Sequence, residues 1–556
     1  MKNKLVVALL IIGGIVLLNI AASFFFFRLD LTEEKRYSLS NATQSLLEGL
    51  AEKDTADVFV KVYLDGDELP GGFERLKRAV SETLEEFKVY GGTKINYTFI
   101  NPNSETDPKK REEFYMQLAQ KGMTPTRIVD TKNGRQVETI IFPYTLVSSG
   151  KFELPVLLLK GTQGKTAEEK LNQSYENVEY ELATAIRKLT QTDRKKIGLL
   201  AEFTKLKPLN FSDLIASLQE RYDLFIINSK QSSTFEGLDA IILPKPDMPV
   251  DDSTKYKIDQ FIMGGGRALF FVDGLKVDSV GLEGNYAQPL DLNLTDLLFK
   301  YGVRINNNIV KDGASCAVIP LVVGELGDRP NIQPVPYRYF PLINNFGKSL
   351  ITNNIDLVYS RYVASMDTVR ADGVTKVPLL MTSPYTKVLN APAFITFNDA
   401  RTDTDQAEYK GGVKTIAYLL EGKFQSLYKN QIIDPKATGF KAESEPTKII
   451  VCSDGDLIVN EVSQKTGNPL PLGYDKATQH TFGNKDFVLN AIDYLIDENG
   501  VIKARGKEVK LRPLDKLRTR DERTFWQILN IGLPVGLVIV FGFVLQWLRR
   551  KNYGSV

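Results

Sequence analysis

Three aspartates form the residue pattern closest to a metal or phosphate site. Asp273 follows the apolar run ALFFV, and the pair Asp454 and Asp456 follows the run IIVCS. Such runs are typical of buried strands, and open α/β sheets bind their ligands at the carboxyl ends of the strands. Carboxylates gathered there can hold Mg²⁺ or Ca²⁺. The alternative, which we favour, is that these aspartates cap the turns that follow their strands.

The string IIVCSDGDLI resembles the aspartate strand of haloacid-dehalogenase-type phosphatases, so a metal-dependent phosphatase is one interpretation. However, Ser453 replaces the first aspartate of that pattern, and Ile458 stands where a threonine or valine is expected. His480 is the only histidine and has no nucleophile motif beside it. The strings Gly164 to Thr166 and Gly347 to Ser349 lack the first glycine of a phosphate loop. We therefore predict no enzymatic activity and no cofactor.

Composition restricts the classes of partner and redox chemistry. Lys and Arg number 70 and Asp and Glu 68, which gives a formal net charge of +2. A domain that binds nucleic acid is usually strongly basic, so nucleic acid is not an expected partner. The only cysteines, Cys316 and Cys452, belong to no Cys-x-x-Cys or zinc pattern. They could pair in an oxidising compartment or stay as two buried thiols, and the sequence leaves both open.

Two uninterrupted apolar stretches predict membrane spans. They run from Leu5 to Phe27 and from Ile528 to Trp547, and each has about the length that crosses the hydrocarbon layer as a helix. Basic residues before the first span and after the second favour a cytoplasmic position for both tails. The basic residues are Lys2, Lys4, Arg549, Arg550 and Lys551. The region between the spans is then expected outside the cytoplasm.

That region has the composition of a folded body, and the expected fold class is α/β. The first domain has the order strand, helix, strand, helix, which is similar to a thioredoxin-like unit without redox cysteines. In the second, continuous apolar strands alternate with helices, which indicates a mostly parallel, doubly wound sheet. The expected segments are a transmembrane anchor at 1–28, a first α/β domain at 29–192, a second α/β domain at 193–500 with a β-rich insertion at about 303–445, a charged linker at 501–525, a transmembrane helix at 526–548 and a tail at 549–556.

Aromatic residues beside prolines form one candidate contact surface. Tyr337, Tyr339 and Phe340 lie in the segment RPNIQPVPYRYFPLINNFG. Exposed rings next to prolines make docking sites of low conformational entropy. Equally, the rings could pack a long loop onto its own domain. The sequence does not choose between the two.

The approach to the second span and the span itself offer further candidate contacts. Arg518, Arg520 and Arg523 are basic residues that either form a solvated linker or contact lipid phosphates or an acidic partner. Gly532 and Gly536 would let a second helix approach closely.

Several strings, in their order along the chain, resemble the auxiliary-protein family of the gliding-motility (Gld) ABC transporter of Bacteroidetes. The strings are RLDLTEEKRYSLS, ENVEYELATAIRKLT, LDAIILP, FIMGGGRALFFVDG, VCSDGDLIVN, FGNKDFVLNAIDYL and LRPLDKLRTRDE. The resemblance implies a Rossmann-like domain shared with intraflagellar-transport proteins and akin to the glutamine-amidotransferase fold. The nucleophilic cysteine of that fold is absent, because the strand ends at Asp273-Gly274, and a family string similar to Gly-His-Gly-Glu is replaced by Ala201-Glu202.

The resemblance also implies a role and a location. The chain would be a non-catalytic subunit in the bacterial inner membrane, with two spans, both termini cytoplasmic and the bulk periplasmic. Its partners would be a multi-span permease, a separate cytoplasmic ATPase reached indirectly, and membrane lipid. A homodimer within the complex, an outer protein and a small ligand stay open as further partners. The alternative functions are a periplasmic solute-binding subunit and the metal-dependent phosphatase.

Overall fold

The computed structural model divides the chain into two units, Met1–Lys507 and Glu508–Val556. The first predicted span lies outside the described residues except for Gly13, as does the linker up to residue 519, which includes Arg518. The described residues are 13, 38–52, 56–66, 69–132, 135–160, 166–190, 194–278, 280–327, 329–402, 405–430, 439–496 and 520–553.

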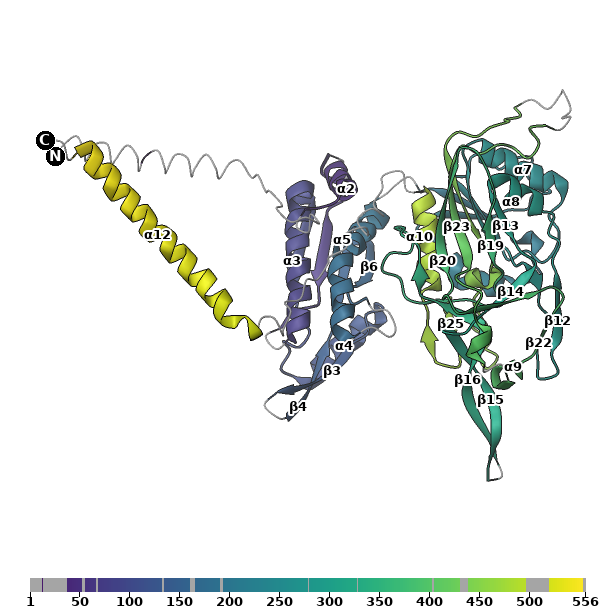
Figure 1. The fold of residues 1–556 in the computed structure, drawn as a ribbon, viewed down its shortest axis with the longest axis horizontal. Helices are drawn as coiled ribbons and strands as arrows, with labels where there is room; N and C mark the ends of the chain where they lie inside the picture. The colour runs from purple at the N-terminus through teal and green to yellow at the C-terminus, as the bar shows by residue number, and fades with distance from the viewer. Residues whose placement is uncertain are drawn as a thin grey trace. The chain divides into compact units, whose positions relative to one another are not determined.

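The larger unit is a mixed α/β structure with many sheets (Figure 1). Its amino-terminal part, residues 38–190, contains a four-stranded sheet in the order β2-β1-β5-β6, in which β1 and β2 are parallel and the other two pairs are antiparallel. The helix between β1 and β2 buries an apolar stripe at steps of three and four residues, as the sequence predicts. The bounds are α2 Asn41–Glu52, β1 Val58–Val62, α3 Gly71–Gly91, β2 Ile95–Phe99, α4 Pro108–Gln120, β3 Thr126–Lys132, β4 Arg135–Ile141, β5 Tyr144–Ser149, β6 Phe152–Leu157 and α5 Ala167–Thr190.

One core fills the space between this sheet and three of its helices. Side chains of α2, α3 and α5 share an apolar cluster with alternate residues of the strands, including Val58, Val60 and Val62. A second, smaller cluster lies around Leu118 of α4 and Tyr144 of β5. Both faces of the sheet therefore carry packed helices, and the hairpin β3–β4 forms a separate two-stranded sheet.

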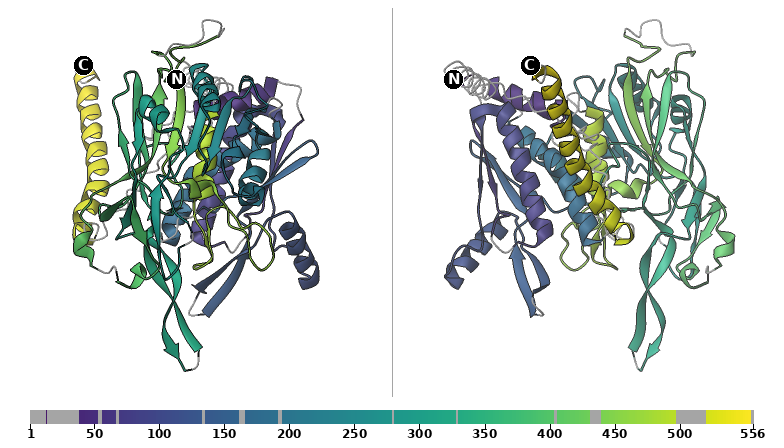
Figure 2. Two further views of the ribbon diagram at one scale, coloured as in Figure 1. Left: turned by 90° about the vertical axis from the view of Figure 1, so that its right-hand side faces the viewer. Right: turned by 60° about the vertical axis from the view of Figure 1, so that its left-hand side comes forward.

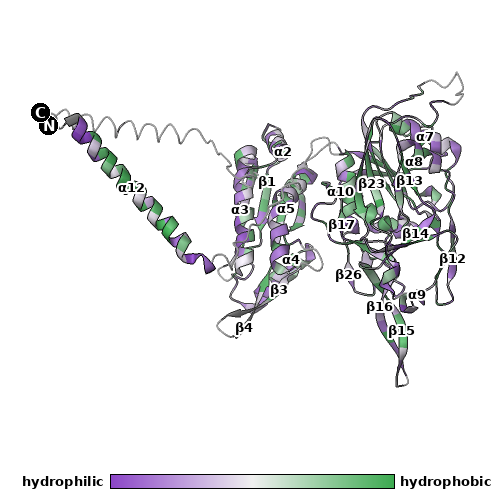
Figure 3. Ribbon diagram, in the orientation of Figure 1, coloured by the Kyte–Doolittle hydropathy of each residue, from purple (hydrophilic) through white to green (hydrophobic). Residues whose placement is uncertain are grey.

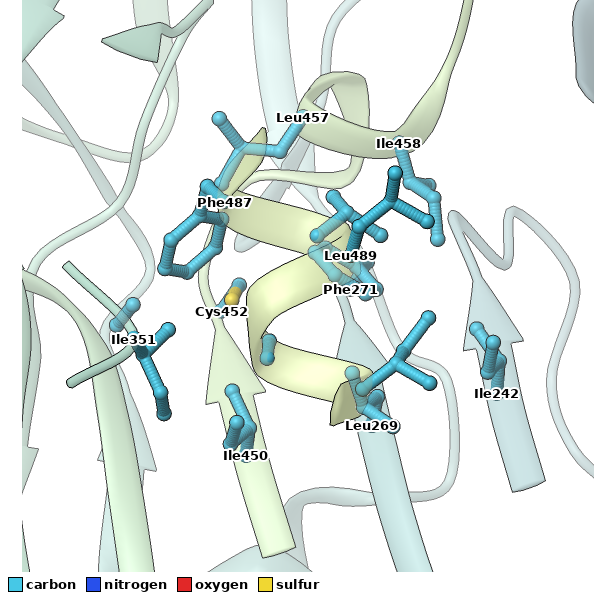
Figure 4. Packing of buried hydrophobic residues seen from close by; sticks show 14 of the residues in the cluster. Ile242, Leu269, Phe271, Ile351, Ile450, Cys452, Leu457, Ile458, Phe487 and Leu489 are labelled. Carbon is cyan, nitrogen blue, oxygen red and sulfur yellow. The ribbon is translucent and has the colours of Figure 1, made fainter. Parts of the chain in front are cut away.

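The main-sheet part, residues 194–496, is built on a ten-stranded sheet in which β8, β7, β9, β10 and β24 are neighbours and parallel. Alternate strand residues enter two different cores. Leu269 and Ile450 pack with α6 and α10, whereas Ala268 and Val451 pack with α7 and α8. Figure 4 shows the first of these cores beneath α10. The bounds are β7 Lys196–Leu199, α6 Ser212–Gln219, β8 Asp223–Ile226, β9 Ala240–Pro244, α7 Asp252–Met263, β10 Arg267–Phe271, α8 Thr295–Tyr301, β24 Thr447–Cys452 and α10 Asn484–Ile496.

Much of the segment 303–445 does not form a separate insertion. Its strand β23 pairs antiparallel with β24, and β13, β19, β20 and β17 continue the same sheet. The sheet boundary therefore falls inside the expected insertion, because strand pairing joins residues that are remote in sequence. The bounds are β13 Val303–Ile305, β17 Asn345–Phe346, β19 Met366–Thr368, β20 Val374–Met381 and β23 Thr415–Gly422.

The other strands of the main-sheet part form small sheets. The hairpin β15–β16 is long and projects from the rest of this part (Figure 2). Prolines in it remove backbone donors from its edges, which discourages pairing with further strands. The bounds are β11 Leu275–Lys276, β12 Asn285–Pro289, β14 Asn308–Asp312, β15 Cys316–Leu326, β16 Arg329–Ile343, β18 Val358–Tyr359, β21 Thr386–Asn390, β22 Ala393–Ile395, α9 Asp399–Thr402, β25 Tyr474–Asp475 and β26 His480–Thr481.

The smaller unit contains one long helix, α12, which spans Arg523–Tyr553. Within its segment Arg523–Lys551, an 18-residue window has a mean hydropathy of 2.5. By length and composition this helix can cross a membrane. Figure 3 shows an apolar middle between two polar ends. The helix contains the second predicted span and places Trp526 and Trp547 near its ends.

Candidate functional site

The structure brings the three candidate aspartates together and adds a lysine between them. Lys245 follows β9, Asp273 follows β10, and Asp454 and Asp456 follow β24, so all four lie at the carboxyl edge of three neighbouring strands. The Lys245 Nζ lies 3.0 Å from Asp273 Oδ2 and 2.7 Å from Asp456 Oδ2. The ammonium group therefore occupies the position between two carboxylates that a metal ion would need. In LDAIILPK, Lys245 also follows a buried strand, so it shares the sequence pattern of the aspartates.

Backbone geometry supports this position of Lys245. Its φ of 44° lies in the left-handed region, which is uncommon for a residue with a side chain. At Gly455, an added Cβ would lie 2.4 Å from Lys245 Cγ, so the absence of a side chain there leaves room for the lysine. The local chain is thus adapted to hold the ammonium group against the aspartates.

The aspartates also accept hydrogen bonds from the backbone. The Gly455 N–H donates to Asp273 Oδ1 at 2.6 Å. Asp454 is fully buried, and its two oxygens accept from the N–H groups of Asp456 and Arg361 at 2.8 and 2.9 Å. Asp454 therefore caps the turn that follows its own strand, as the alternative to metal binding predicts, whereas Asp273 accepts a hydrogen bond from the turn after β24.

The charges of this cluster are coupled. Burial raises the pKa of Asp454, and the neighbouring carboxylates of Asp456 and Asp273 raise it further. Burial also raises the pKa of Asp273. Burial alone would lower the pKa of Lys245, but the Asp273 and Asp456 carboxylates raise it above its usual value. The lysine consequently stays charged and neutralises part of the buried negative charge.

A second charged group, centred on Arg361, lies beside the aspartates. Its guanidinium group pairs with Glu461, and its Nε donates to the Tyr359 hydroxyl at 3.1 Å. Glu461 also lies 2.6 Å from Lys476 Nζ. Tyr359, Arg361, Glu461 and Asp456 are among the residues that line a pocket of about 30 Å³. Pockets that bind organic ligands are roughly 300 to 1,000 Å³, so this one has room for water-sized groups only. The sequence offered no signal for Arg361, because it lies in the segment interpreted as an insertion.

The aromatic candidates are mostly not at the surface. The side chains of Tyr337 and Tyr339 are 0% and 1% exposed, and their ring centroids are 5.1 Å apart. The Tyr339 hydroxyl donates to Asp399 at 2.6 Å, and Phe340, which is partly buried, meets Tyr337 edge to face. The docking interpretation requires exposure that Tyr337 and Tyr339 do not have. The other interpretation, that the rings pack the segment onto its own domain, describes what is observed.

The remaining reactive side chains are one histidine with a hydrogen-bond partner and two thiols, of which Cys316 is partly exposed and Cys452 is buried. His480 Nε2 lies 3.1 Å from Asp356 Oδ2, and its ring packs against Phe482. Cys316 and Cys452 are free thiols. Burial raises the pKa of Cys316 to about 11 and raises that of Cys452 well above its usual value, so neither forms a thiolate at neutral pH.

Residues of α12 keep their status as candidates for contacts with lipid or protein. Arg520 and Arg523 lie at the start of the helical segment and are exposed. Apart from the adjoining residues and the backbone of the same helix, no atom lies within 4 Å of an added Cβ at Gly536, and at Gly532 only the Ile528 side chain of the same helix does. This surface of the helix is therefore open to a neighbouring helix.

Comparisons with known proteins agree with a transport role. Residues 194–491 match the family described as an ABC-type uncharacterized transport system, and residues 33–148 match a domain of unknown function (DUF7088). An uncharacterized protein of Borreliella burgdorferi is 23% identical over 548 residues, which cover 95% of each chain. The structure of the mmIFT52 N-terminal domain covers 54% of this chain and 97% of its own at 14% identity, but its TM-score of 0.30 is too low to support a shared fold. Because the match to residues 194–491 spans more than half of the sequence, the chain belongs to the auxiliary-protein family of ABC-type uncharacterized transport systems.

Proposed function

We propose that this protein is a non-catalytic, membrane-anchored subunit of an ABC transporter, working with a multi-span permease and a separate cytoplasmic ATPase. Membership of the family supports an accessory role in transport. The apolar helix α12 supports attachment to the membrane. The resemblance of the sequence strings to the gliding-motility family supports motility as the process, with the body in the periplasm and a second span at the amino-terminal end.

The position of Lys245 is the main observation in favour of a non-catalytic function. A catalytic carboxylate must meet a substrate, a metal or a reacting water. Here Asp273 and Asp456 meet the Lys245 ammonium, and Asp454 meets two backbone N–H groups. The carboxylates at the carboxyl edge of the sheet therefore have ionic and hydrogen-bond partners within the protein itself.

The pocket beside Arg361 favours an accessory role over solute binding. A solute-binding subunit needs a cavity that encloses most of its ligand. The pocket of about 30 Å³ is far smaller than a sugar, an amino acid or a peptide needs. This pocket therefore does not support solute binding, and we assign the large folded body to contacts with other proteins.

The test is affinity purification of the full chain from membranes in mild detergent, followed by mass spectrometry. We expect a multi-span permease and an ATPase to accompany the chain. A matched variant carries an unrelated single span of equal length in place of Arg523–Lys551. We expect this variant to stay in the membrane and recover less permease, because the open helix surface at Gly532 and Gly536 is lost.

Recovery of neither transporter protein by a folded, membrane-bound wild-type chain would contradict the proposal. Equal recovery by both chains would show that α12 serves as an anchor only and that the permease contact lies in the folded body. The process is tested separately by deleting the protein from its host. Loss of surface spreading with normal growth would support the role in motility.

A further inference from the structure

A buried carboxylate joins the amino-terminal part of the larger unit to the main-sheet part. Asp493, on α10, is 1% exposed. From α5, the Tyr180 hydroxyl donates to its Oδ2 at 3.3 Å, and the Arg187 guanidinium lies 3.8 Å from Oδ1. From the main-sheet part, Arg221 Nη1 lies 2.9 Å from Oδ2, and the Tyr222 hydroxyl donates to Oδ1. We call these five residues the Asp493 joint.

Few apolar contacts support the joint. Among the described residues, the one apolar cluster that spans both parts consists of Tyr180, Leu350 and Tyr494. The large cores do not cross the boundary, because one contains only residues before 190 and the other two contain only residues after 196. A further polar contact, from Asn354 Nδ2 to Glu176 Oε2 at 3.1 Å, also crosses it. Polar interfaces of this kind between folded parts permit relative motion.

Asp493 has charged and hydroxyl partners on both sides of the boundary, so it can stay paired whether the two parts are closed together or open. A buried carboxylate that loses all its partners is strongly destabilising. If α5 moved away, Asp493 would keep the Arg221 guanidinium and the Tyr222 hydroxyl of its own part. Opening therefore leaves no unpaired charge in the main-sheet part, and its cost is limited to the contacts made by α5.

The charge of Asp493 itself is constant near neutral pH. Burial on its own would raise the pKa of Asp493, but the Arg221 and Arg187 guanidinium groups hold it below its usual value. A carboxylate with a lowered pKa in the folded state makes its contribution above its usual pKa and loses it as the pH falls through the lowered one. Acid would therefore weaken the contacts of Asp493. Lys188 of α5 lies near the same interface, and burial and the Arg221 guanidinium lower its pKa to about 8.

We infer that the Asp493 joint is a conformational latch, which holds the amino-terminal part on the main-sheet part when closed and releases it when a partner pulls or binds. This inference concerns the larger unit alone and does not depend on which transporter the chain serves. It assigns α5 to the moving side, because α5 packs into the core of the amino-terminal part through Val178, Leu182 and Ile186. The main-sheet part contains Asp493 together with its partners Arg221 and Tyr222, so these three residues stay together when α5 moves away.

The test measures the distance between nitroxide labels on the two parts of the full chain by pulsed electron–electron double resonance. Nitroxide labels are placed by Glu48→Cys on α2 and Ser253→Cys on α7, both exposed positions. The chain without these two substitutions, labelled in the same way, reports any reaction of the native thiols. We expect one dominant distance in the wild-type background.

The double variant Tyr180→Phe with Arg187→Gln removes the contacts from α5 and keeps those from the main-sheet part. We expect the population at other distances to rise about tenfold, since hydrogen bonds to a charged group of this kind are worth about one decade in an equilibrium. The matched control, Tyr222→Phe, removes a hydrogen bond to the same carboxylate within the main-sheet part. It is expected to lower the melting temperature without changing the distance distribution.

Two outcomes would overturn the inference. One is a double variant with the wild-type distance distribution, and the other is a Tyr222→Phe variant that opens as far as the double variant. If the double variant does not fold, Asn354→Gly, which suits the φ of 52° at this position, tests the same interface by removing the contact with Glu176. This variant is also expected to raise the open population, by less than the double variant, and an unchanged distribution would count against the latch.

Discussion

Replacing Lys245 with methionine is expected to lower the free energy of unfolding of the main-sheet part by about 3 kcal/mol. The substitution keeps a side chain of similar length but removes the ammonium group between Asp273 and Asp456. Two carboxylates then face each other near the fully buried Asp454 without a counter-charge. The change is measured by urea unfolding followed by far-ultraviolet circular dichroism. Tryptophan fluorescence is unsuitable, because both tryptophans lie in α12.

The matched control for this experiment is Lys276→Met. Lys276 Nζ lies 3.4 Å from Asp278, but the two side chains are 48% and 63% exposed. Solvent screens such a pair, so the loss is expected to stay below about 1 kcal/mol. Adding Asp273→Asn to Lys245→Met should recover part of the lost stability, because it removes one of the unpaired carboxylates. Equal effects of Lys245→Met and Lys276→Met would show that the cluster does not depend on Lys245.

Replacing Gly347 with alanine is expected to lower the free energy of unfolding by about 3 kcal/mol. An added Cβ would lie 1.7 Å from the carbonyl oxygen of Pro378, which belongs to the backbone of β20 and cannot rotate away. The Gly347 N–H donates to the Leu379 carbonyl at 3.0 Å, so the two chains run in close contact here. The change is measured by thermal unfolding. The same geometry explains the glycine of the Gly347 to Ser349 string, which approaches a strand and not a phosphate.

Gly49→Ala is the control for the second experiment. Gly49 lies inside α2, and an added Cβ there meets no atom within 4 Å. Alanine in a helix is more favourable than glycine by about 0.5 to 1 kcal/mol, so this variant is expected to gain stability. Opposite signs for the two glycine substitutions support the close approach of Gly347 to β20. A Gly347→Ala variant with wild-type thermal stability would contradict the prediction, because it would mean that the backbone around Pro378 shifts at little cost.

At the candidate site, the sequence predicted which residues lie at the edge of the sheet but not which groups contact one another. The rule that ligands and caps gather at the carboxyl ends of buried strands correctly selected Asp273, Asp454 and Asp456 as neighbours. It did not reveal that Lys245 lies between them, since the sequence does not state that β9, β10 and β24 are adjacent. The hydrogen bond from Gly455 to Asp273 joins residues 182 positions apart. Whether the carboxylates meet a metal or a lysine is decided by that long-range pairing.

The sequence by itself determined the features that depend on neighbouring residues. The apolar stripe of α3 and the span in α12 follow from helical periodicity and from hydropathy summed along one segment, and each helix forms its hydrogen bonds within that segment. Only the tertiary structure decided that β23 joins the main sheet, that Tyr337 and Tyr339 are buried, and that Asp493 meets α5. These outcomes depend on which distant strands and helices pack together, and a pattern of period two or 3.6 specifies a face to bury but not the partner that covers it.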